Sequence, residues 1–270
     1  MTRRPARLVT FLSDFGLDSP YPAAMKAVAA AICDARFIDI SHAVPPHAVR
    51  TGAYLLWSLA PVCPPDTVHC AVVDPGVGTA RAPLAVAAGG QVFVGPDNGL
   101  LLPAAKRLGR PEVYRLTNPA YWREPVSATF HGRDIFAPAA AHLAAGITLD
   151  DVGAPAPAYT DLGIDEGRWD GPILRGAVLW VDPFGNLVTT IPGGLLRGFP
   201  DSRNAVVEVG ARKVPAAIGR TFGDVCPGHA VVITGSDGLV EIAVNQGSAA
   251  EALAAGPGDC VRVGREDIGS

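Results

Sequence analysis

Three short polar segments carry residue types that can do chemistry on a small molecule. They are residues 74–81 (DPGVGTAR), 130–134 (FHGRD) and 182–186 (DPFGN). Each ends an apolar run and sets charged or amide side chains beside glycine or proline, which is how a rigid element presents polar groups to a ligand. An Asp, an Arg and a His from the first two segments could converge on one reacting water.

Each of these three residues also has an ordinary structural interpretation. Asp74 could cap the backbone of its turn, Arg81 could be a surface arginine, and His131 could be a loop histidine. Their joint placement in glycine-bearing loops favours a shared functional role. Composition alone does not identify the reaction.

The elements that position these segments alternate in the first half of the chain. Short apolar runs at 8–12, 37–40, 67–73 and 91–95 predict strands, and residues 23–33, 48–59 and 133–145 predict helices. Alternation of this kind predicts an α/β layer with a mostly parallel sheet. Ligands bind beyond the carboxyl ends of strands in such sheets, and Asp14 and Asp74 both fall at such ends.

The second half has a different pattern. Strand-like runs at 173–181, 205–209, 230–234 and 239–244 are separated by turn residues, with one short helical stretch at 249–255. This pattern predicts a small antiparallel β-barrel or sandwich. We therefore expect an N-terminal α/β domain at 1–160, a linker at 161–172 and a C-terminal β-barrel-like domain at 173–270.

Composition excludes several classes of protein. Of 270 residues, 49% are apolar and the net charge is 22 − 26 = −4, without a long basic run, so nucleic acid is not an expected partner. The apolar run after the basic start is broken at Ser13-Asp14, which makes it too short for a signal peptide, and no apolar stretch is long enough to cross a bilayer. We expect a cytoplasmic protein without a membrane partner. Five scattered cysteines predict buried thiols rather than disulfides.

Several familiar patterns are incomplete in this chain. Asp14-Phe15-Gly16 lacks the other kinase motifs, and Gly76-Val77-Gly78 lacks the third glycine of a dinucleotide-binding loop. His42 and His47 are spaced as loop histidines rather than as a metal pair. No Gly-x-Ser-x-Gly elbow is present to indicate an α/β-hydrolase.

The order of the polar segments resembles a known family. Residues 13–16 (SDFG), 74–79 (DPGVGT), 96–101 (PDNGLL), 129–134 (TFHGRD), 182–186 (DPFGN), 235–238 (GSDG) and 241–243 (EIA) appear in sequence. Together they are similar to the S-adenosyl-L-methionine (SAM) hydroxide adenosyltransferases, also called adenosine-forming SAM hydrolases, which are relatives of fluorinase and chlorinase. The resemblance runs from Leu8 to Val263.

The resemblance implies hydrolysis of SAM by attack of water or hydroxide at the ribose C5′, giving adenosine and L-methionine. It also implies a homotrimer that binds SAM between the N-terminal domain of one subunit and the C-terminal domain of its neighbour. The family's Asp-Arg-His set falls on Asp74, Arg81 and His131. The halogenases carry Tyr at the aspartate position, a Tyr-Ser pair near His131 and an inserted loop, and these departures favour hydroxide over halide.

The resemblance assigns seven further residues to the substrate: Asp14, Asp182, Phe184, Asn186, Ser236, Val244 and Gln246. Asp14 is implied to hold the ribose hydroxyls, and Asp182 and Ser236 the methionine amino and carboxylate groups. Phe184 and Asn186 are implied to contact adenine, and the segment after Glu241 to approach it through backbone groups. His47 stands where the halogenases place a Trp, and no contact is assigned to it.

The chemistry agrees with this assignment. Methionine leaves a sulfonium as a neutral thioether, so neither a general acid, a metal nor a cofactor is required. Arg81 can favour hydroxide by its charge, and either Asp74 or His131 can accept the proton. The alternatives are a chlorinase-like halogenase, and a SAM- or adenosine-binding regulatory module with little turnover, which would not need the Asp-Arg-His set.

Overall fold

The computed structural model describes residues 8–199 and 205–265, so the chain ends included in the predicted domains lie partly outside it. The chain forms two compact units, residues 1–162 and 163–270. The range predicted as a linker, 161–172, spans this boundary and contains a short strand, β8 (Arg168–Asp170). The two units are described separately.

The first unit is built on one seven-stranded sheet in the order β2-β1-β3-β5-β4-β6-β7. Its strands are β1 (Leu8–Ser13), β2 (Arg36–Ser41), β3 (Val68–Val72), β4 (Pro83–Ala88), β5 (Gln91–Pro96), β6 (Glu112–Leu116) and β7 (Gly153–Pro155). β2, β1, β3 and β5 are parallel neighbours, whereas β4, β6 and β7 pair antiparallel. The α/β class with a parallel-rich sheet is confirmed, and β4, β6 and β7 were not predicted.

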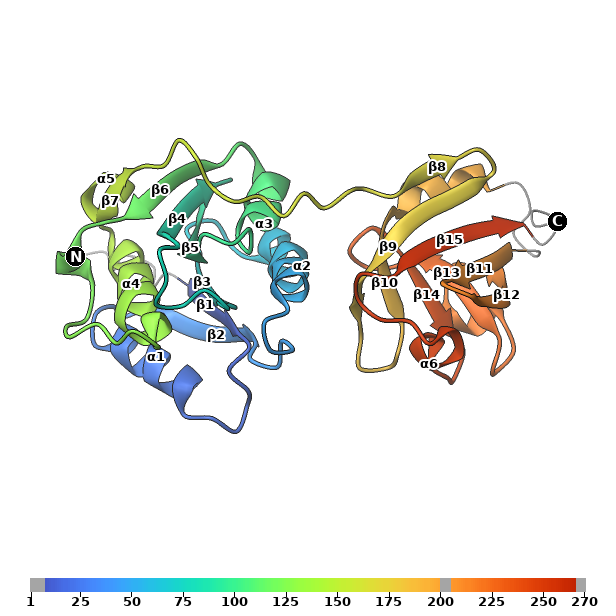
Figure 1. The fold of residues 1–270 in the computed structure, drawn as a ribbon, viewed down its shortest axis with the longest axis horizontal. Helices are drawn as coiled ribbons and strands as arrows, with labels where there is room; N and C mark the ends of the chain where they lie inside the picture. The colour runs from blue at the N-terminus through green and yellow to red at the C-terminus, as the bar shows by residue number, and fades with distance from the viewer. Residues whose placement is uncertain (1–7, 200–204, 266–270) are drawn as a thin grey trace. The chain divides into compact units, whose positions relative to one another are not determined.

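Helices cover both faces of this sheet (Figure 1). α1 (Tyr21–Ala30) and α4 (Ala137–Ala145) pack in one hydrophobic cluster, and α2 (Val49–Leu59) and α3 (Leu102–Leu108) pack in the other. The central strands are buried on both sides, which explains why β1 and β3 read as continuous apolar runs rather than alternating ones. The short helical segments of this unit are α5 (Leu149–Val152), η1 (Ala60–Val62), η2 (Pro119–Tyr121) and η3 (Gly132–Phe136).

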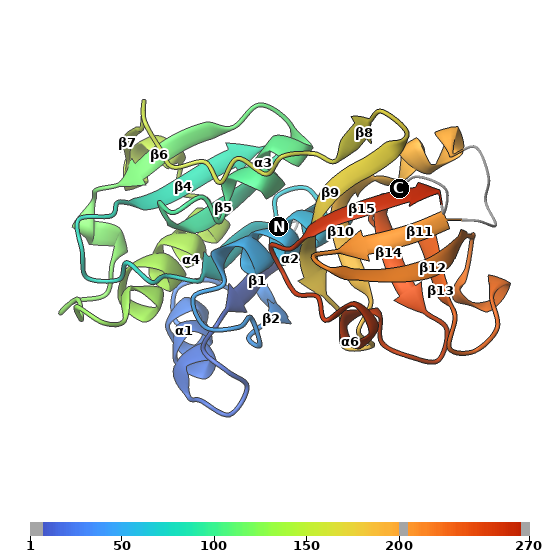
Figure 2. The ribbon, with the colours of Figure 1, turned by 45° about the vertical axis from the view of Figure 1, so that its right-hand side comes forward.

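The second unit is a closed barrel (Figure 2). Its strands are β9 (Ile173–Val181), β10 (Leu187–Pro192), β11 (Ala205–Val209), β12 (Arg212–Ile218), β13 (Ala230–Thr234), β14 (Leu239–Val244) and β15 (Cys260–Arg265). Pairing of β9 with β10 closes the ring, and β8 adds to β9 from outside. The helical segments of the barrel unit are α6 (Ala249–Leu253), η4 (Gly193–Gly198) and η5 (Phe222–Asp224). The predicted β-barrel-like domain is confirmed, with one parallel pair, β12–β13.

Two sequence predictions about single residue types have mixed outcomes. All five cysteines are free, but only Cys70 is buried, so the prediction of buried thiols is wrong for the exposed Cys226 and Cys260. Both lie at the surface of the barrel unit, near turns and strand ends. Within residues 8–199 and 205–265, no helix has the length and apolar character needed to cross a membrane.

Candidate active site

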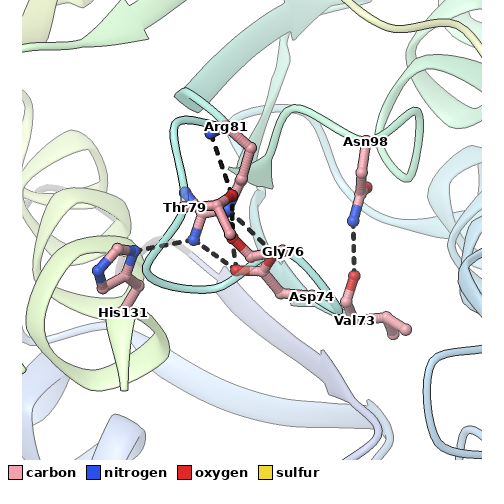
Figure 3. A network of polar contacts seen from close by, with 7 residues as sticks. All are labelled: Val73, Asp74, Gly76, Thr79, Arg81, Asn98 and His131. Atoms are coloured by element: carbon pink, nitrogen blue, oxygen red, sulfur yellow. Dashed lines mark hydrogen bonds and ion pairs between the residues drawn. The ribbon is translucent and has the colours of Figure 1, made fainter. Parts of the chain in front are cut away.

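Asp74 and Arg81 lie at the two ends of one tight loop that follows β3 (Figure 3). The Thr79 hydroxyl donates to the carbonyl oxygen of Gly76 at 2.7 Å and accepts the N–H of Arg81 at 3.4 Å. Gly78 has φ +75°, a conformation that favours glycine. The loop therefore turns back on itself and brings its last residue beside its first.

The turn after β5 holds both ends of this loop. The Asn98 side chain donates to the carbonyl oxygen of Val73 at 2.8 Å, and the backbone N–H of Asp97 donates to that of Ala82 at 2.9 Å. The segment 96–101 therefore fixes the position of the loop that carries Asp74 and Arg81.

Arg81 and Asp74 form an ion pair that is almost closed to solvent. Their side chains are 10% and 5% exposed. The Arg81 Nε donates to both carboxylate oxygens at 3.0 Å, and Nη2 donates to Oδ2. The Arg81 guanidinium also lies over the Phe136 ring, 5.0 Å from its centroid. Both charges are thus held in one orientation by several contacts.

His131 joins this pair from the other side (Figure 3). It immediately precedes η3, a π-helical turn that leads into α4. Its Nδ1 lies 2.8 Å from Nη2 of Arg81. Partial burial and the Arg81 charge lower the pKa of His131, and the Asp74 and Asp134 carboxylates oppose that shift. The three residues singled out from sequence are therefore joined through Arg81.

The His131 segment is anchored by a buried carboxylate. Asp134 is 0% exposed and binds Arg133 at 2.7 Å and Arg123 at 3.1 Å, and it also accepts the backbone N–H of Ser127 at 2.9 Å. These partners lower the pKa of Asp134, although burial alone would raise it. This network therefore fixes the 123–134 loop, which contains His131.

The Asp74 loop packs directly on that same 123–134 loop. A Cβ atom on Gly78 would lie only 2.4 Å from the carbonyl oxygen of Ala128. The aromatic rings of Phe15, Tyr21 and Phe130 pack edge to face and join the loop after β1 to the same region. Three loops from separate strands therefore meet at one edge of the sheet.

Asp14 follows β1, which is the parallel neighbour of β3, so it lies at the same sheet edge as Asp74. Its Oδ2 accepts the backbone N–H of His47 at 2.9 Å, and His47 holds a left-handed φ of +66° to present that group. The buried His42 contacts the hydroxyl of Ser13 at 2.7 Å. Both histidines are loop residues, as predicted, and the structure adds that they contact the Ser13–Asp14 segment.

Asp182, Phe184 and Asn186 form the turn between β9 and β10 in the barrel unit. The Asp182 Oδ1 accepts the backbone N–H groups of Phe184 and Asn186, each at 2.8 Å, and Oδ2 accepts the Asn186 side-chain amide at 2.8 Å. The Phe184 side chain is 78% exposed. The turn therefore presents an aromatic ring while its own polar groups are largely engaged with each other.

A pocket of about 690 Å³ opens beside this turn. Its lining consists of Asp182, Phe184, Asn186, Phe222, Glu241, Val244, Gln246 and Gly247. Five of the seven residues predicted to bind substrate line it. Ser236 is not among them and lies in the exposed turn between β13 and β14, whereas Asp14 belongs to the other unit.

Three pocket residues, Phe222, Glu241 and Gly247, were not predicted as site residues. Burial raises the pKa of the Glu241 carboxyl, and the nearby Asp182 and Asp237 charges raise it further. Phe222 stands in a 3₁₀ turn closed by a Thr221–Asp224 capping box. That capping pattern is visible in the sequence, but it marks a turn and not a ligand.

Within the described part of the chain, no group of three or more His, Cys, Asp or Glu side chains is arranged to hold a metal ion. Metal independence and the lack of a cofactor stay predictions.

Comparison with known proteins decides the family. Sequence models of the SAM hydroxide adenosyltransferase N-terminal and C-terminal domains match residues 9–153 and 176–262. The chain belongs to the SAM hydroxide adenosyltransferase family. The two matched ranges fall in the α/β unit and the barrel unit, and they include the residues of both candidate site regions.

Curated relatives cover nearly the whole chain. A protein from Thermus thermophilus named (R)-S-adenosyl-L-methionine hydrolase is 45% identical, over 95% of this chain and 99% of its own. One from Salinispora tropica with the same name is 45% identical, over 96% and 98%. A fluorinase from Actinoplanes is more distant, at 28% identity over 68% of this chain and 71% of its own.

A solved structure from Thermotoga maritima, described as an uncharacterized conserved protein, has the same fold. It is 38% identical, covers 95% of this chain and 100% of its own, and gives a TM-score of 0.90.

Proposed function

We propose that this protein hydrolyses SAM at the ribose C5′ and releases adenosine and L-methionine. The observation that carries the proposal is the contact of Arg81 with both Asp74 and His131 at one edge of the α/β sheet. The family membership and the relatives named (R)-S-adenosyl-L-methionine hydrolase support it.

The chemistry needs a positioned oxygen nucleophile and little else. The C5′–S bond of a sulfonium breaks with its electron pair going to sulfur, so methionine leaves as a neutral thioether. The enzyme's task is to hold water in line with that bond and to favour loss of its proton. Arg81 supplies a nearly buried positive charge that stabilises developing hydroxide, and Asp74 lies beside it as a carboxylate acceptor.

We assign the substrate's other parts to Asp14 and to the barrel pocket. Asp14 keeps acceptor capacity after binding the His47 N–H, which suits the ribose hydroxyls. The exposed Phe184 and the nearby Phe222 offer aromatic surfaces for adenine. Val244 and Gln246 border the same pocket with the segment that follows β14. The acidic groups of Asp182 and Glu241 suit the positive methionine end.

Three further features belong to this proposal. The protein works without a metal or cofactor, with SAM as its substrate. It acts in the cytoplasm. It assembles as a homotrimer, in which the residues of the α/β unit and those of the barrel pocket complete each other between subunits.

A product assay tests the reaction and its alternatives. SAM is incubated with the protein, with and without chloride, and the nucleoside product is identified. Adenosine and methionine in both mixtures are the expected result. 5′-Chloroadenosine as the main product would indicate a halogenase, and bound but uncleaved SAM would indicate a regulatory module.

A further inference from the structure

The contact between Arg81 and His131 fixes which ring nitrogen of His131 carries a proton. Nη2 of Arg81 lies 2.8 Å from Nδ1 of His131. A guanidinium has only N–H donors and no lone pair to offer. The Nδ1 atom must therefore accept, so the neutral ring carries its hydrogen on Nε2.

The surroundings also disfavour the doubly protonated ring. An imidazolium would place an N–H against the N–H of Arg81. Partial burial and the Arg81 charge both lower the pKa of His131, whereas Asp74 and Asp134 act the other way. The Asp134 charge is already engaged by Arg123 and Arg133. The contact with Arg81 therefore favours the neutral ring.

The second ring nitrogen of His131, Nε2, does not face the Asp74–Arg81 pair. The two ring nitrogens of an imidazole point in widely different directions, and Nε2 lies on the side of the ring away from Arg81 (Figure 3). The nitrogen that faces the pair is occupied by Arg81. Asp74, in contrast, keeps an acceptor site, because Oδ1 accepts a single Arg81 N–H.

We propose that His131 is a positioning residue, held as the Nε2–H tautomer, which orients the Arg81 guanidinium, and that Asp74 accepts the proton of the attacking water. This assignment rests on the proposed function. The water oxygen forms a bond to C5′ as the C5′–S bond breaks, and the water proton passes to the Asp74 carboxylate. The proton then leaves to solvent, so SAM and water give adenosine, methionine and one proton.

The first test reads the tautomer without using activity. Long-range proton–nitrogen NMR of the ¹⁵N-labelled protein distinguishes a ring nitrogen that carries hydrogen from one that carries a lone pair. We expect the Nε2–H form for His131 at neutral pH, assigned by its loss in His131→Asn. The Nδ1–H tautomer or an imidazolium would overturn the proposal. This result is independent of whether SAM is the substrate.

The second test separates positioning from base catalysis. His131→Asn places an amide oxygen near the former Nδ1, so it can still accept from Arg81, but it cannot take up a proton at neutral pH. We expect its kcat to stay within about tenfold of wild type, whereas His131→Ala should lose on the order of a hundredfold because the Arg81 guanidinium is displaced. Circular dichroism and the thermal midpoint confirm that both variants fold. A loss in His131→Asn as large as that in His131→Ala would overturn the positioning role of His131.

The pH profile gives a third reading. Because His131 is not the proton acceptor in this proposal, the pH dependence of kcat should be the same in His131→Asn as in wild type. A change in that dependence in this variant would contradict the proposal.

Discussion

The Arg81 guanidinium contacts every other member of the candidate catalytic set. It bonds Asp74 through two nitrogens, contacts His131 through one of them, and lies over the Phe136 ring. A lysine ammonium has the same charge but not the planar fork that makes these contacts together. The geometry of this single side chain therefore carries most of the proposed chemistry.

Replacement of Arg81 tests that dependence. We expect Arg81→Lys to lower kcat by about tenfold or more, because the fork is lost although the charge remains. Arg81→Ala should lower kcat by ten- to ten-thousand-fold, roughly the span for a positioned catalytic group. Steady-state kinetics separate this from an effect on SAM binding, which should change little. Wild-type kcat in Arg81→Ala would refute the role of Arg81 in stabilising hydroxide.

The sequence predicts the residues of this set better than those of the barrel pocket. Asp74, Arg81 and His131 stand in glycine-bearing loops after apolar runs, and that pattern marks a presented polar group. No such pattern precedes Phe222 or Glu241, because Phe222 lies in a capped turn and Glu241 lies inside strand β14. Only closure of the barrel brings them beside Phe184.

The loops act as elements that hold one another at the sheet edge. Gly78 lies so close to the 123–134 loop that an added Cβ would be only 2.4 Å from the carbonyl oxygen of Ala128. Its φ of +75° and the absence of a Cβ are both required there. The register of the two loops, and hence the contact of Arg81 with His131, depends on this position.

We expect Gly78→Ala to lower both stability and kcat. The left-handed conformation alone costs about 1–2 kcal/mol, and the clash with the Ala128 carbonyl adds to it and displaces the loop. Gly228→Ala is the matched control, since Gly228 has φ +81° and nothing within 4 Å of an added Cβ. The control should lose stability without loss of kcat. Equal kcat in the two variants would contradict the proposed close approach.

The buried Asp134 network makes the stability of the second loop dependent on pH. Asp134→Asn should destabilise the protein by about 3 kcal/mol near neutral pH, at the low end for a broken buried ion pair because both arginines are partly exposed. The folded-state pKa of Asp134 is lowered, so its contribution is full above the unfolded carboxyl pKa and is lost as pH falls.

Urea unfolding at several pH values measures this effect. The difference between wild type and Asp134→Asn should shrink as pH falls from about 5 to about 3. A difference that is constant over that range would show that the Asp134 charge does not contribute.

Strands with continuous apolar runs were predictable, whereas elements with a weak sequence signal were not. The buried runs of β1, β3 and β5 stand out from sequence because both of their faces lie under helices. β4 begins at Pro83 and is rich in alanine, so it carries little strand signal, although it is fully integrated between β5 and β6. The π-helical turn after His131 also has no sequence pattern of its own.

At the scale of the whole molecule, the candidate site residues fall in two units. Asp14, Asp74, Arg81 and His131 belong to the α/β unit, and the pocket beside Phe184 belongs to the barrel. The proposed homotrimer combines them between neighbouring subunits. The sequence alone indicates two domains, since its periodicity changes between the halves. It does not indicate whether the α/β unit of one subunit works with its own barrel unit or with that of a neighbour.

Mixing of inactive variants tests the intersubunit site. We expect Arg81→Ala to impair the α/β half of the site and Asn186→Ala to weaken SAM binding in the barrel half. Co-expressed mixed trimers should recover part of the wild-type activity, because some sites would combine two intact halves, and sedimentation should show a trimer. Activity no greater than that of the separate variants, or a fully active monomer, would contradict intersubunit sites.

Attack of water at C5′ of SAM is the step on which the proposed function depends. Turnover in ¹⁸O-labelled water, with mass spectrometry of both products, follows the attacking oxygen. We expect the label on the 5′-hydroxyl of adenosine and unlabelled methionine. Label in the methionine carboxylate, or a nucleoside product without label, would contradict it.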